Sequence, residues 1–345
     1  MIDSSTKVLL IYTGGTIGMV ENKITGALEP FNFNHLRSNV PEMKRLNFIV
    51  ESYIFDPPID SSDVSLETWQ QMVKVIESHY DNYDGFVILH GTDTMSYTAS
   101  ALSFMCDNLT KPVIFTGSQL PIGKLRTDAK ENLITALEIA ADKDVNGAPK
   151  VPELSVYMQN LLIRGNRTTK LNSDNFSAFT SPNCNNLAET GLDIKFNNQV
   201  ILKPNNKKPT VFNYNLDPNV VVLMLFPGIT EETVKAILSI KDLKGVVLET
   251  FGTGNSPVFP WFIKLLKDAI SKGIVIYNVT QCLYGKVEMH RYDNGQKLES
   301  IGVISGKDIT IEAALTKMMF LFGNNYTSAE INKLIQTPLR GEISN

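Results

Sequence analysis

The sequence predicts an α/β protein of two domains, with helices on both faces of largely parallel sheets. Short runs of β-branched and other apolar residues alternate with helical patterns. Near-continuous apolar strands separated by helices are typical of parallel sheets buried on both faces. The length of 345 residues, 43% of them hydrophobic, favours two domains over one. The expected strands are 8–12, 86–89, 113–116, 220–226, 246–250 and 274–279.

Two helix starts can be read between these strands. Asp128 and Glu131 have the spacing of a capping box, and apolar residues follow at helical spacing. Thr230 is a suitable N-cap ahead of Glu231 and Glu232. We therefore expect helices to begin at these two places.

Between residues 198 and 219 the alternation of strand and helix patterns stops, and the segment is rich in Asn, Lys and Pro. Such composition is typical of a linker. We therefore predict a larger amino-terminal domain over 1–197 with a parallel or mixed sheet, a linker over 198–219, and a smaller carboxy-terminal domain over 220–345 with a parallel sheet.

The charge and cysteine content exclude several classes of function. Lys plus Arg number 32 against 36 Asp plus Glu, for a net charge of -4, so no concentrated basic surface for nucleic acid is expected. The three cysteines, Cys106, Cys184 and Cys282, suggest neither a disulfide framework nor a metal site, and we expect no metal or cofactor. The polar amino terminus lacks the pattern of a secretory signal, and no apolar run approaches the roughly 20 residues of a membrane span. We expect a cytoplasmic protein with a small-molecule partner.

The first expected strand ends in TGGTIG, residues 13–18. This places the Thr16 hydroxyl at the carboxyl end of a parallel strand, the edge where open α/β sheets bind ligands. The dinucleotide fingerprint GxGxxG does not fit, because Thr13 stands where its first glycine belongs. A plain tight turn in which Thr16 only caps the backbone is the alternative.

The strand expected over 86–89 ends in HGTDT, residues 90–94. It brings the Thr92 hydroxyl and the Asp93 carboxylate to the same edge. A threonine nucleophile loses its proton as it attacks, so a base must lie within hydrogen-bond reach. His90 is a candidate base, but at the end of an apolar strand it is better explained as a hydrogen-bonded structural histidine.

Together with TGSQLP at 116–121 and RGNRTTK at 164–170, these motifs resemble the bacterial cytoplasmic, type I L-asparaginases of the asparaginase/glutaminase family. The resemblance runs from about residue 7 to Arg340, and the order and spacing of the motifs are highly specific. It implies hydrolysis of L-asparagine to L-aspartate and ammonia through a β-aspartyl acyl-enzyme, with glutamine a weaker or negligible substrate. Thr16 is then the nucleophile, and Thr92, Asp93 and Lys170 handle protons.

The resemblance also implies how the substrate is held. Asp93 is expected to bind the substrate α-ammonium, Ser61 the α-carboxylate, and Ser62 to assist at the α-ammonium. DSSD, residues 60–63, is also a common turn before a helix, and both interpretations can hold. Asn255 resembles the residue that the family sends into a neighbouring subunit, which implies a homodimer or a dimer of dimers whose site is completed by that subunit.

A lysine acts as a base only when burial or nearby positive charge lowers its pKa, and Arg164 and Arg167 could supply that charge to Lys170. Many family members carry a tyrosine on the loop after TGGTIG, but residues 21–30 contain none and Ala27 stands near its place. Three candidates for the group that deprotonates Thr16 therefore remain: a water, the pair of Thr92 and Lys170, and a group from elsewhere. The loop, with Gly26 as hinge, is a candidate lid.

Two alternative functions remain. The amidase subunit of a tRNA-dependent amidotransferase shares these motifs, but it normally carries an added domain before the first strand, which here begins near residue 7. A non-catalytic amino-acid-binding protein could use the same scaffold, because one fold hosts many functions.

Overall fold

The computed structural model describes residues 4–21, 28–30 and 39–344. The chain divides into two compact units, Met1–Tyr214 and Asn215–Asn345. This division falls inside the segment 198–219 that the sequence suggests as a linker, and the precise domain limits stay a prediction. Among the described residues, no helix has the length and apolar character needed to cross a membrane.

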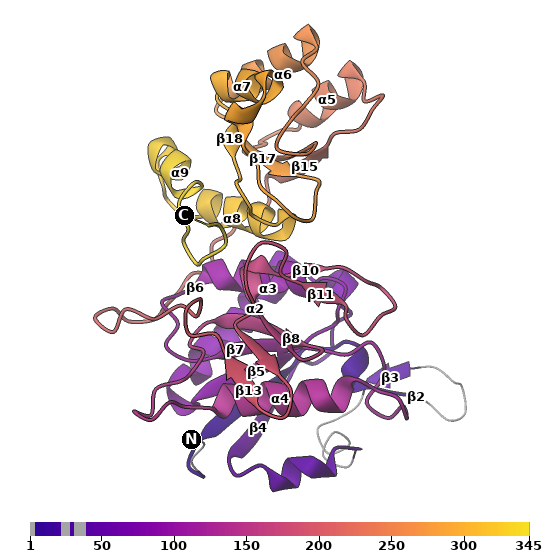
Figure 1. Cartoon of the computed structure of the whole chain (residues 1–345), viewed down its shortest axis with the longest axis vertical. Helices are drawn as coiled ribbons and strands as arrows, with labels where there is room; N and C mark the ends of the chain where they lie inside the picture. The colour runs from indigo at the N-terminus through magenta and orange to yellow at the C-terminus, as the bar shows by residue number, and fades with distance from the viewer. Residues whose placement is uncertain (1–3, 22–27, 31–38, 345) are drawn as a thin grey trace. The chain divides into compact units, whose positions relative to one another are not determined.

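The larger unit is built on an eight-stranded sheet with the order β13-β12-β9-β8-β7-β5-β1-β4 (Figure 1). Strands β4, β1, β5, β7 and β8 are parallel, and β9, β12 and β13 continue the sheet with antiparallel pairs. The strands are β1 (Lys7–Tyr12), β4 (Ile49–Ile54), β5 (Gly85–Leu89), β7 (Val113–Thr116), β8 (Leu154–Met158), β9 (Leu161–Arg164), β12 (Ala188–Thr190) and β13 (Ile194–Phe196). This mixed sheet confirms the predicted α/β class for the larger unit.

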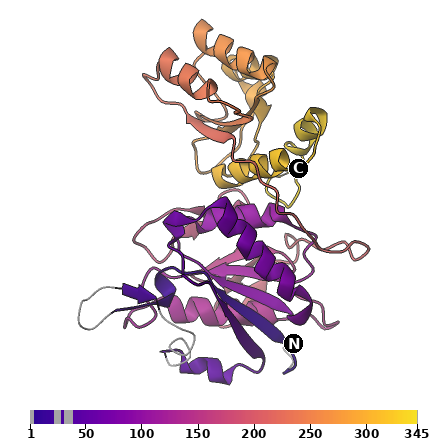
Figure 2. The same cartoon turned by 180° about the vertical axis from the view of Figure 1, so that it is seen from behind.

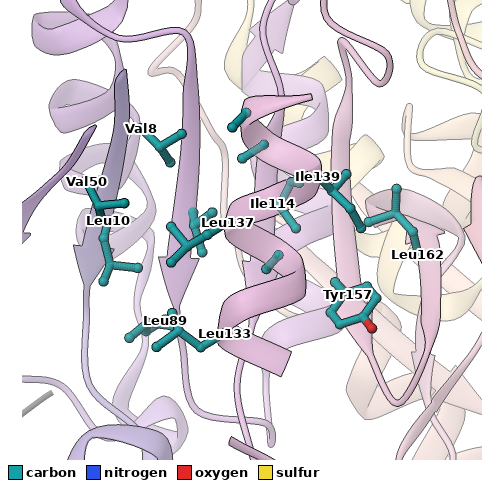
Figure 3. Close-up of a cluster of buried hydrophobic side chains, with 14 of the residues drawn as sticks. Val8, Leu10, Val50, Leu89, Ile114, Leu133, Leu137, Ile139, Tyr157 and Leu162 are labelled. Atoms are coloured by element: carbon teal, nitrogen blue, oxygen red, sulfur yellow. The ribbon is translucent and has the colours of Figure 1, made fainter. Parts of the chain in front are cut away.

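Helices cover both faces of this sheet, as expected for parallel strands. Within the described part of this unit, the helices are α2 (Leu66–His79), α3 (Met95–Met105) and α4 (Ala129–Ala141). On one face, apolar side chains of three strands (Val8, Leu10, Leu89 and Ile114) pack against Leu133 and Leu137 of α4 (Figure 3). On the other face lie α2 and α3 (Figure 2), which are joined by a 3.0 Å hydrogen bond from Trp69 Nε1 to Thr98 Oγ1.

Shorter elements complete the larger unit. Three two-stranded pairs are antiparallel: β2 (Met19–Glu21) with β3 (Leu28–Pro30), β6 (Cys106–Asp107) with β14 (Val211–Phe212), and β10 (Thr169–Lys170) with β11 (Phe179–Thr180). The 3₁₀ turns of this unit are η1 (Thr16–Gly18), η2 (Pro41–Arg45), η3 (Ser61–Asp63), η4 (Tyr80–Asn82) and η5 (Gly165–Arg167). Gly26 and Ala27, invoked for a lid and for the missing tyrosine, lie outside the described residues.

The smaller unit has a four-stranded parallel sheet, as the sequence predicts for the carboxy-terminal part. Its order is β15 (Val220–Met224), β16 (Gly245–Thr250), β17 (Val275–Thr280) and β18 (Ile304–Ser305). The helices of this unit are α5 (Glu231–Leu238), α6 (Pro260–Ser271), α7 (Asp293–Ser300), α8 (Ile311–Gly323) and α9 (Ser328–Leu334), with the 3₁₀ turn η6 (Met289–Arg291) before α7.

The two predicted helix starts have different outcomes. Thr230 caps α5, because its side chain accepts a hydrogen bond from the Thr233 N–H. Helix α4 begins where expected, but the predicted capping box does not form. Asp128 already has helical backbone angles and makes no side-chain cap. Its carboxylate turns back to the preceding loop, where it accepts the N–H groups of Gln119 and Leu120.

Candidate active site

The motif loops that follow β1, β5 and β7 meet at one edge of the larger sheet. Tyr12 pairs with Leu89, and Leu89 pairs with Thr116, so the three strands end side by side. The Thr13 N–H donates to the Leu89 carbonyl at 3.0 Å, and the His90 N–H donates to the Thr116 carbonyl at 3.0 Å. The TGGTIG, HGTDT and TGSQLP segments are therefore neighbours at the carboxyl edge, where ligands bind in such sheets.

Close backbone contacts between glycines bring these loops together. Gly15 has a φ of 86°, and a Cβ atom there would lie 2.5 Å from the Cα of Gly91. A Cβ atom on Gly91 would in turn lie 2.4 Å from the Ser61 hydroxyl oxygen. Since larger residues would force the loops apart, these glycines let the TGGTIG and HGTDT backbones approach closely and leave room for the Ser61 side chain of the DSSD segment against Gly91.

Thr16 lies at the start of η1, directly after the Gly15 contact. The hydroxyl-bearing residue is partly exposed, whereas the following Ile17 is fully buried and anchors the turn. Thr92 follows Gly91 in the same way on the facing loop. The two threonines therefore extend from adjoining loops at the same edge of the sheet.

Lys170 joins Thr92 and Asp93 across a long sequence separation. Its Nζ atom lies 3.0 Å from Thr92 Oγ1 and 2.7 Å from Asp93 Oδ1. The lysine side chain is 17% exposed and the aspartate side chain 68% exposed, so the carboxylate is open to a further cation while the ammonium group is largely shielded. This cluster brings together three of the residues that the sequence singles out for proton transfer.

The expectation that Arg164 lends positive charge to Lys170 is wrong. The Arg164 Nε atom lies 2.6 Å from Glu153 Oε2, and both side chains are only 7% exposed. A buried guanidinium is held by such a partner because an unpaired charge there would be costly. Arg167 is buried in η5, which packs on α3.

The DSSD segment forms η3, a single turn ahead of α2, as the sequence suggests. Asp60 accepts hydrogen bonds from the Ser62 N–H at 2.9 Å and from the Ser62 hydroxyl at 2.6 Å. These bonds lower the pKa of Asp60. Ser61 is 4% exposed and lies against Gly91, and its carbonyl accepts the Thr94 hydroxyl at 2.6 Å. Ser61 is therefore fixed beside the cluster, and Ser62 lies on the outer side of the turn.

Asn255 belongs to the smaller unit, whereas the cluster is built from residues of the larger one. It closes a tight turn after β16, in which Phe251 and Asn255 exchange backbone hydrogen bonds of 2.9 and 2.8 Å. Gly252 and Gly254 have φ angles of 51° and 104° in this turn, which favour glycine. The role of Asn255 toward a neighbouring subunit stays a prediction.

His90 has the environment of a structural residue, in line with the sequence-based interpretation. It is 1% exposed, its Nδ1 lies 2.7 Å from the Gly91 carbonyl, and its ring packs edge-on against Phe115. Because a carbonyl only accepts, Nδ1 carries the proton of this bond. Burial lowers the pKa of His90 to about 4, so the ring is neutral near pH 7.

The depressed pKa of His90 predicts a loss of stability in acid. An unfolded histidine titrates near pH 6.5, so the unfolded state binds the additional proton first as the pH falls. Its contribution to stability is present above about pH 6.5 and is lost as the pH falls toward 4. Denaturant unfolding of the unmodified protein and of His90→Asn should show their difference in unfolding free energy shrinking by roughly 2 kcal/mol between about pH 7 and pH 5. A difference that does not change with pH would contradict the assignment.

Gln119 is a residue of the cluster to which the sequence analysis assigned no role. The Thr92 hydroxyl donates to Gln119 Oε1 at 3.4 Å, and Gln119 Nε2 donates to the Asn175 carbonyl at 3.0 Å. An uncharged glutamine carries no chemical signal of its own in the sequence. Its place inside the TGSQLP motif was the only available indication.

The fold and these motif contacts define a two-unit α/β protein with a threonine- and lysine-containing site at a strand edge. Residues 7–202 match the family model "Asparaginase, N-terminal", and residues 219–335 match "Glutaminase/Asparaginase C-terminal domain". The chain belongs to the asparaginase/glutaminase family.

Individual relatives agree with the resemblance to type I enzymes. The chain is similar to L-asparaginase 1 of Escherichia coli strain K12, with 41% identity over 342 residues and 98% coverage of both chains. It is similar to the crystal structure of L-asparaginase I from Vibrio cholerae, with a TM-score of 0.89, 40% identity and coverage of 99% and 100% of the two chains. Identity to a glutamyl-tRNA(Gln) amidotransferase polypeptide of Pyrococcus abyssi is lower, at 31% over 349 residues, covering 98% of this chain and 77% of that protein.

Proposed function

We propose that this protein hydrolyses L-asparagine to L-aspartate and ammonia, with Thr16 as the nucleophile. The observation that carries the proposal is the pair of hydrogen bonds from the Lys170 ammonium to Thr92 and Asp93. Thr92 and Asp93 lie on the loop that adjoins the Thr16 turn. Family membership and 41% identity to an L-asparaginase over nearly the whole chain support the same substrate.

The reaction proceeds in two steps. The Thr16 hydroxyl oxygen attacks the side-chain amide carbon of asparagine while its proton is transferred away. The C–N bond then breaks, the leaving nitrogen takes up a proton and departs as ammonia, and a β-aspartyl ester remains on Thr16. Water attacks this ester, releases aspartate and restores the hydroxyl. Thr92 and Lys170 are assigned to proton transfer, and the first acceptor of the Thr16 proton is a water, this pair or a group from elsewhere.

The surrounding groups suit an amino acid zwitterion. The exposed Asp93 carboxylate can form a charge-assisted hydrogen bond with the substrate α-ammonium. Ser61, held against Gly91, is proposed to bind the α-carboxylate, and Ser62 to assist at the α-ammonium. The carboxylate of Asp60 stays ionised beside Ser62, because its pKa is lowered, and adds negative charge where the ammonium would bind.

We further propose a cytoplasmic homodimer or dimer of dimers, in which Asn255 of one subunit completes the site of the next. Light scattering of the purified protein measures the assembly. A titration of initial rate against asparagine tests whether asparagine also binds a second, regulatory site, since a sigmoidal dependence requires interacting sites.

Purified protein should release ammonia from L-asparagine without tRNA or any added cofactor. With L-glutamine, kcat/KM should be lower by a factor of about 100 or more, because the extra methylene displaces the amide carbon from Thr16. The measurement is initial ammonia release for both amino acids. Binding of asparagine without turnover would favour an amino-acid-binding protein, and turnover that requires tRNA and a second subunit would favour the amidotransferase.

A further inference from the structure

We propose that Gln119 is a positioning residue that ties Thr92 to the hairpin carrying Lys170. The inference rests on the proposed function, because it concerns the same proton-transfer pair. Thr92 and Lys170 are 78 residues apart in sequence, and they lie on separate elements. Their 3.0 Å contact therefore depends on whatever holds the two elements in place.

The Gln119 side chain makes one hydrogen bond to each side of this pair. Its Oε1 atom accepts the Thr92 hydroxyl at 3.4 Å, and its Nε2 atom donates to the Asn175 carbonyl at 3.0 Å. A carbonyl only accepts, so the bond to Asn175 fixes which end of the amide is the NH₂ group. The amide oxygen is thereby directed at Thr92.

Asn175 lies in the connection between β10, the strand that carries Lys170, and β11, its partner in the hairpin. The hairpin is closed by the Leu171 N–H donating to the Ala178 carbonyl at 2.7 Å. Asn175 is fixed within it, because its Oδ1 atom accepts the Ser177 N–H at 3.0 Å. A bond from Gln119 to Asn175 therefore holds the hairpin next to the HGTDT loop.

Gln119 is itself anchored from behind. Its backbone N–H donates to the Asp128 carboxylate at 3.1 and 3.2 Å, and the Leu120 N–H donates to the same group at 3.2 Å. Asp128 also accepts from Asn132 one turn into α4. The carboxylate that does not cap its own helix thus fixes the loop from which Gln119 extends.

These contacts determine the direction of the Thr92 hydroxyl. A hydroxyl has one proton and two lone pairs. Lys170 donates a hydrogen bond to the oxygen and so occupies one lone pair. The hydroxyl donates its own hydrogen bond to Gln119 Oε1, so the second lone pair stays available to a substrate-side donor. Without Gln119, the hydroxyl can rotate and the hairpin loses a tether, and both changes misplace the groups that exchange a proton.

The test uses Gln119→Met, which has similar length without the amide, and Gln119→Glu, which keeps an oxygen acceptor for Thr92 but loses the donor to Asn175. Gln70→Met is the matched control, since Gln70 Nε2 also donates to a backbone carbonyl, that of Tyr214, at 2.9 Å. The measurements are kcat and KM for L-asparagine, the unfolding temperature, and amide hydrogen exchange over residues 169–180.

For Gln119→Met we expect kcat to fall by about 100-fold with KM within about threefold, because misplacement of reacting groups lowers the rate more than binding. Gln119→Glu should retain a higher kcat than Gln119→Met, and exchange over residues 169–180 should speed up in both. Gln70→Met should match the unmodified protein in all three measurements. Unchanged unfolding temperatures exclude a general loss of structure.

Three results separate the possible failures. If the unmodified protein hydrolyses asparagine and Gln119→Met keeps its kcat, or loses it only through a lower unfolding temperature, the positioning role is overturned and the proposed function stands. If the unmodified protein releases no ammonia, the proposed function is overturned and the positioning role with it. Unchanged hydrogen exchange over residues 169–180 in Gln119→Met overturns the tether to the hairpin whatever the activity.

Discussion

Thr16→Ala is expected to lower kcat for L-asparagine by roughly 10⁴-fold or more, with the protein still folded. Without the hydroxyl no β-aspartyl ester can form, and the remaining groups are left to assist only direct attack by water. The fold should survive, because Thr16 is partly exposed and the turn is anchored by the buried Ile17. The measurement is ammonia release at saturating asparagine, with thermal unfolding recorded on the same samples.

Controls separate the loss of the nucleophile from a general effect of removing a threonine hydroxyl. Thr92→Ala should also lose several orders of magnitude, and the double variant should lose little more than either one, because residues that act as a unit are not additive. Thr233→Ala, at an exposed position in α5, should keep full activity. Retention of a tenth or more of the activity in Thr16→Ala would contradict its role as nucleophile.

Most of the strands that sequence reasoning located are central strands, and the exception is β15, an edge strand of the smaller sheet. β1, β5, β7, β16 and β17 are short apolar runs buried on both faces, so composition alone reveals them. β4 was missed because it is an edge strand, where the outward residues Ile49 and Ile54 are 41% and 39% exposed and polar residues interrupt the apolar run.

The β8 and β9 hairpin was missed for a different reason. Its two-residue connection, Gln159 and Asn160, has φ angles of 49° and 70°. Tight hairpin turns of this kind favour Asn-Gly or Asp-Gly, and glutamine is not a usual residue at such a position. The sequence therefore carries no strong turn signal, and the pairing of Met158 with Leu161 is visible only in the structure.

The candidate site also has a part that the sequence predicts and a part that it does not. Motif residues such as Thr16 and Thr92 can be predicted, because each follows an expected strand and the strands share an edge. The contacts between them depend on side-chain directions that no local pattern encodes. Asp128 faces the preceding loop instead of its own helix, and Arg164 faces Glu153 instead of Lys170. Both errors arose from assigning charged groups to their nearest partners in sequence.

The buried ion pair between Lys317 and Glu342 in the smaller unit is expected to dominate the stability of the carboxy-terminal segment. Both side chains are 0% exposed, and the Lys317 Nζ atom lies 2.5 Å from Glu342 Oε1. The ammonium also donates to the carbonyls of Ile335 and Thr337, at 2.9 and 2.7 Å. Its three donors are thus matched by three acceptors, and the segment after α9 folds around the helix α8 that carries the lysine.

Lys317→Met should lower the free energy of unfolding by about 3–5 kcal/mol, because it leaves the Glu342 carboxylate and two carbonyls buried without their donor. Lys317→Met combined with Glu342→Gln should be less destabilised than Lys317→Met alone. The neutral amide removes the buried charge, and its oxygen can still accept the N–H groups of Leu339 and Arg340 that Glu342 now accepts. Denaturant unfolding of both single variants and the double variant gives the coupling free energy between the two residues.

The exposed pair of Lys264 and Asp268 provides the matched control. These side chains are 78% and 52% exposed, with an N–O distance of 3.4 Å, and Lys264→Met should change stability by less than about 1 kcal/mol. A loss at Lys317 as small as that at Lys264 would show that the segment 335–342 relaxes to admit water to Glu342. The contrast between the two lysines therefore tests whether burial of the ion pair, rather than the ion pair itself, makes the lysine necessary.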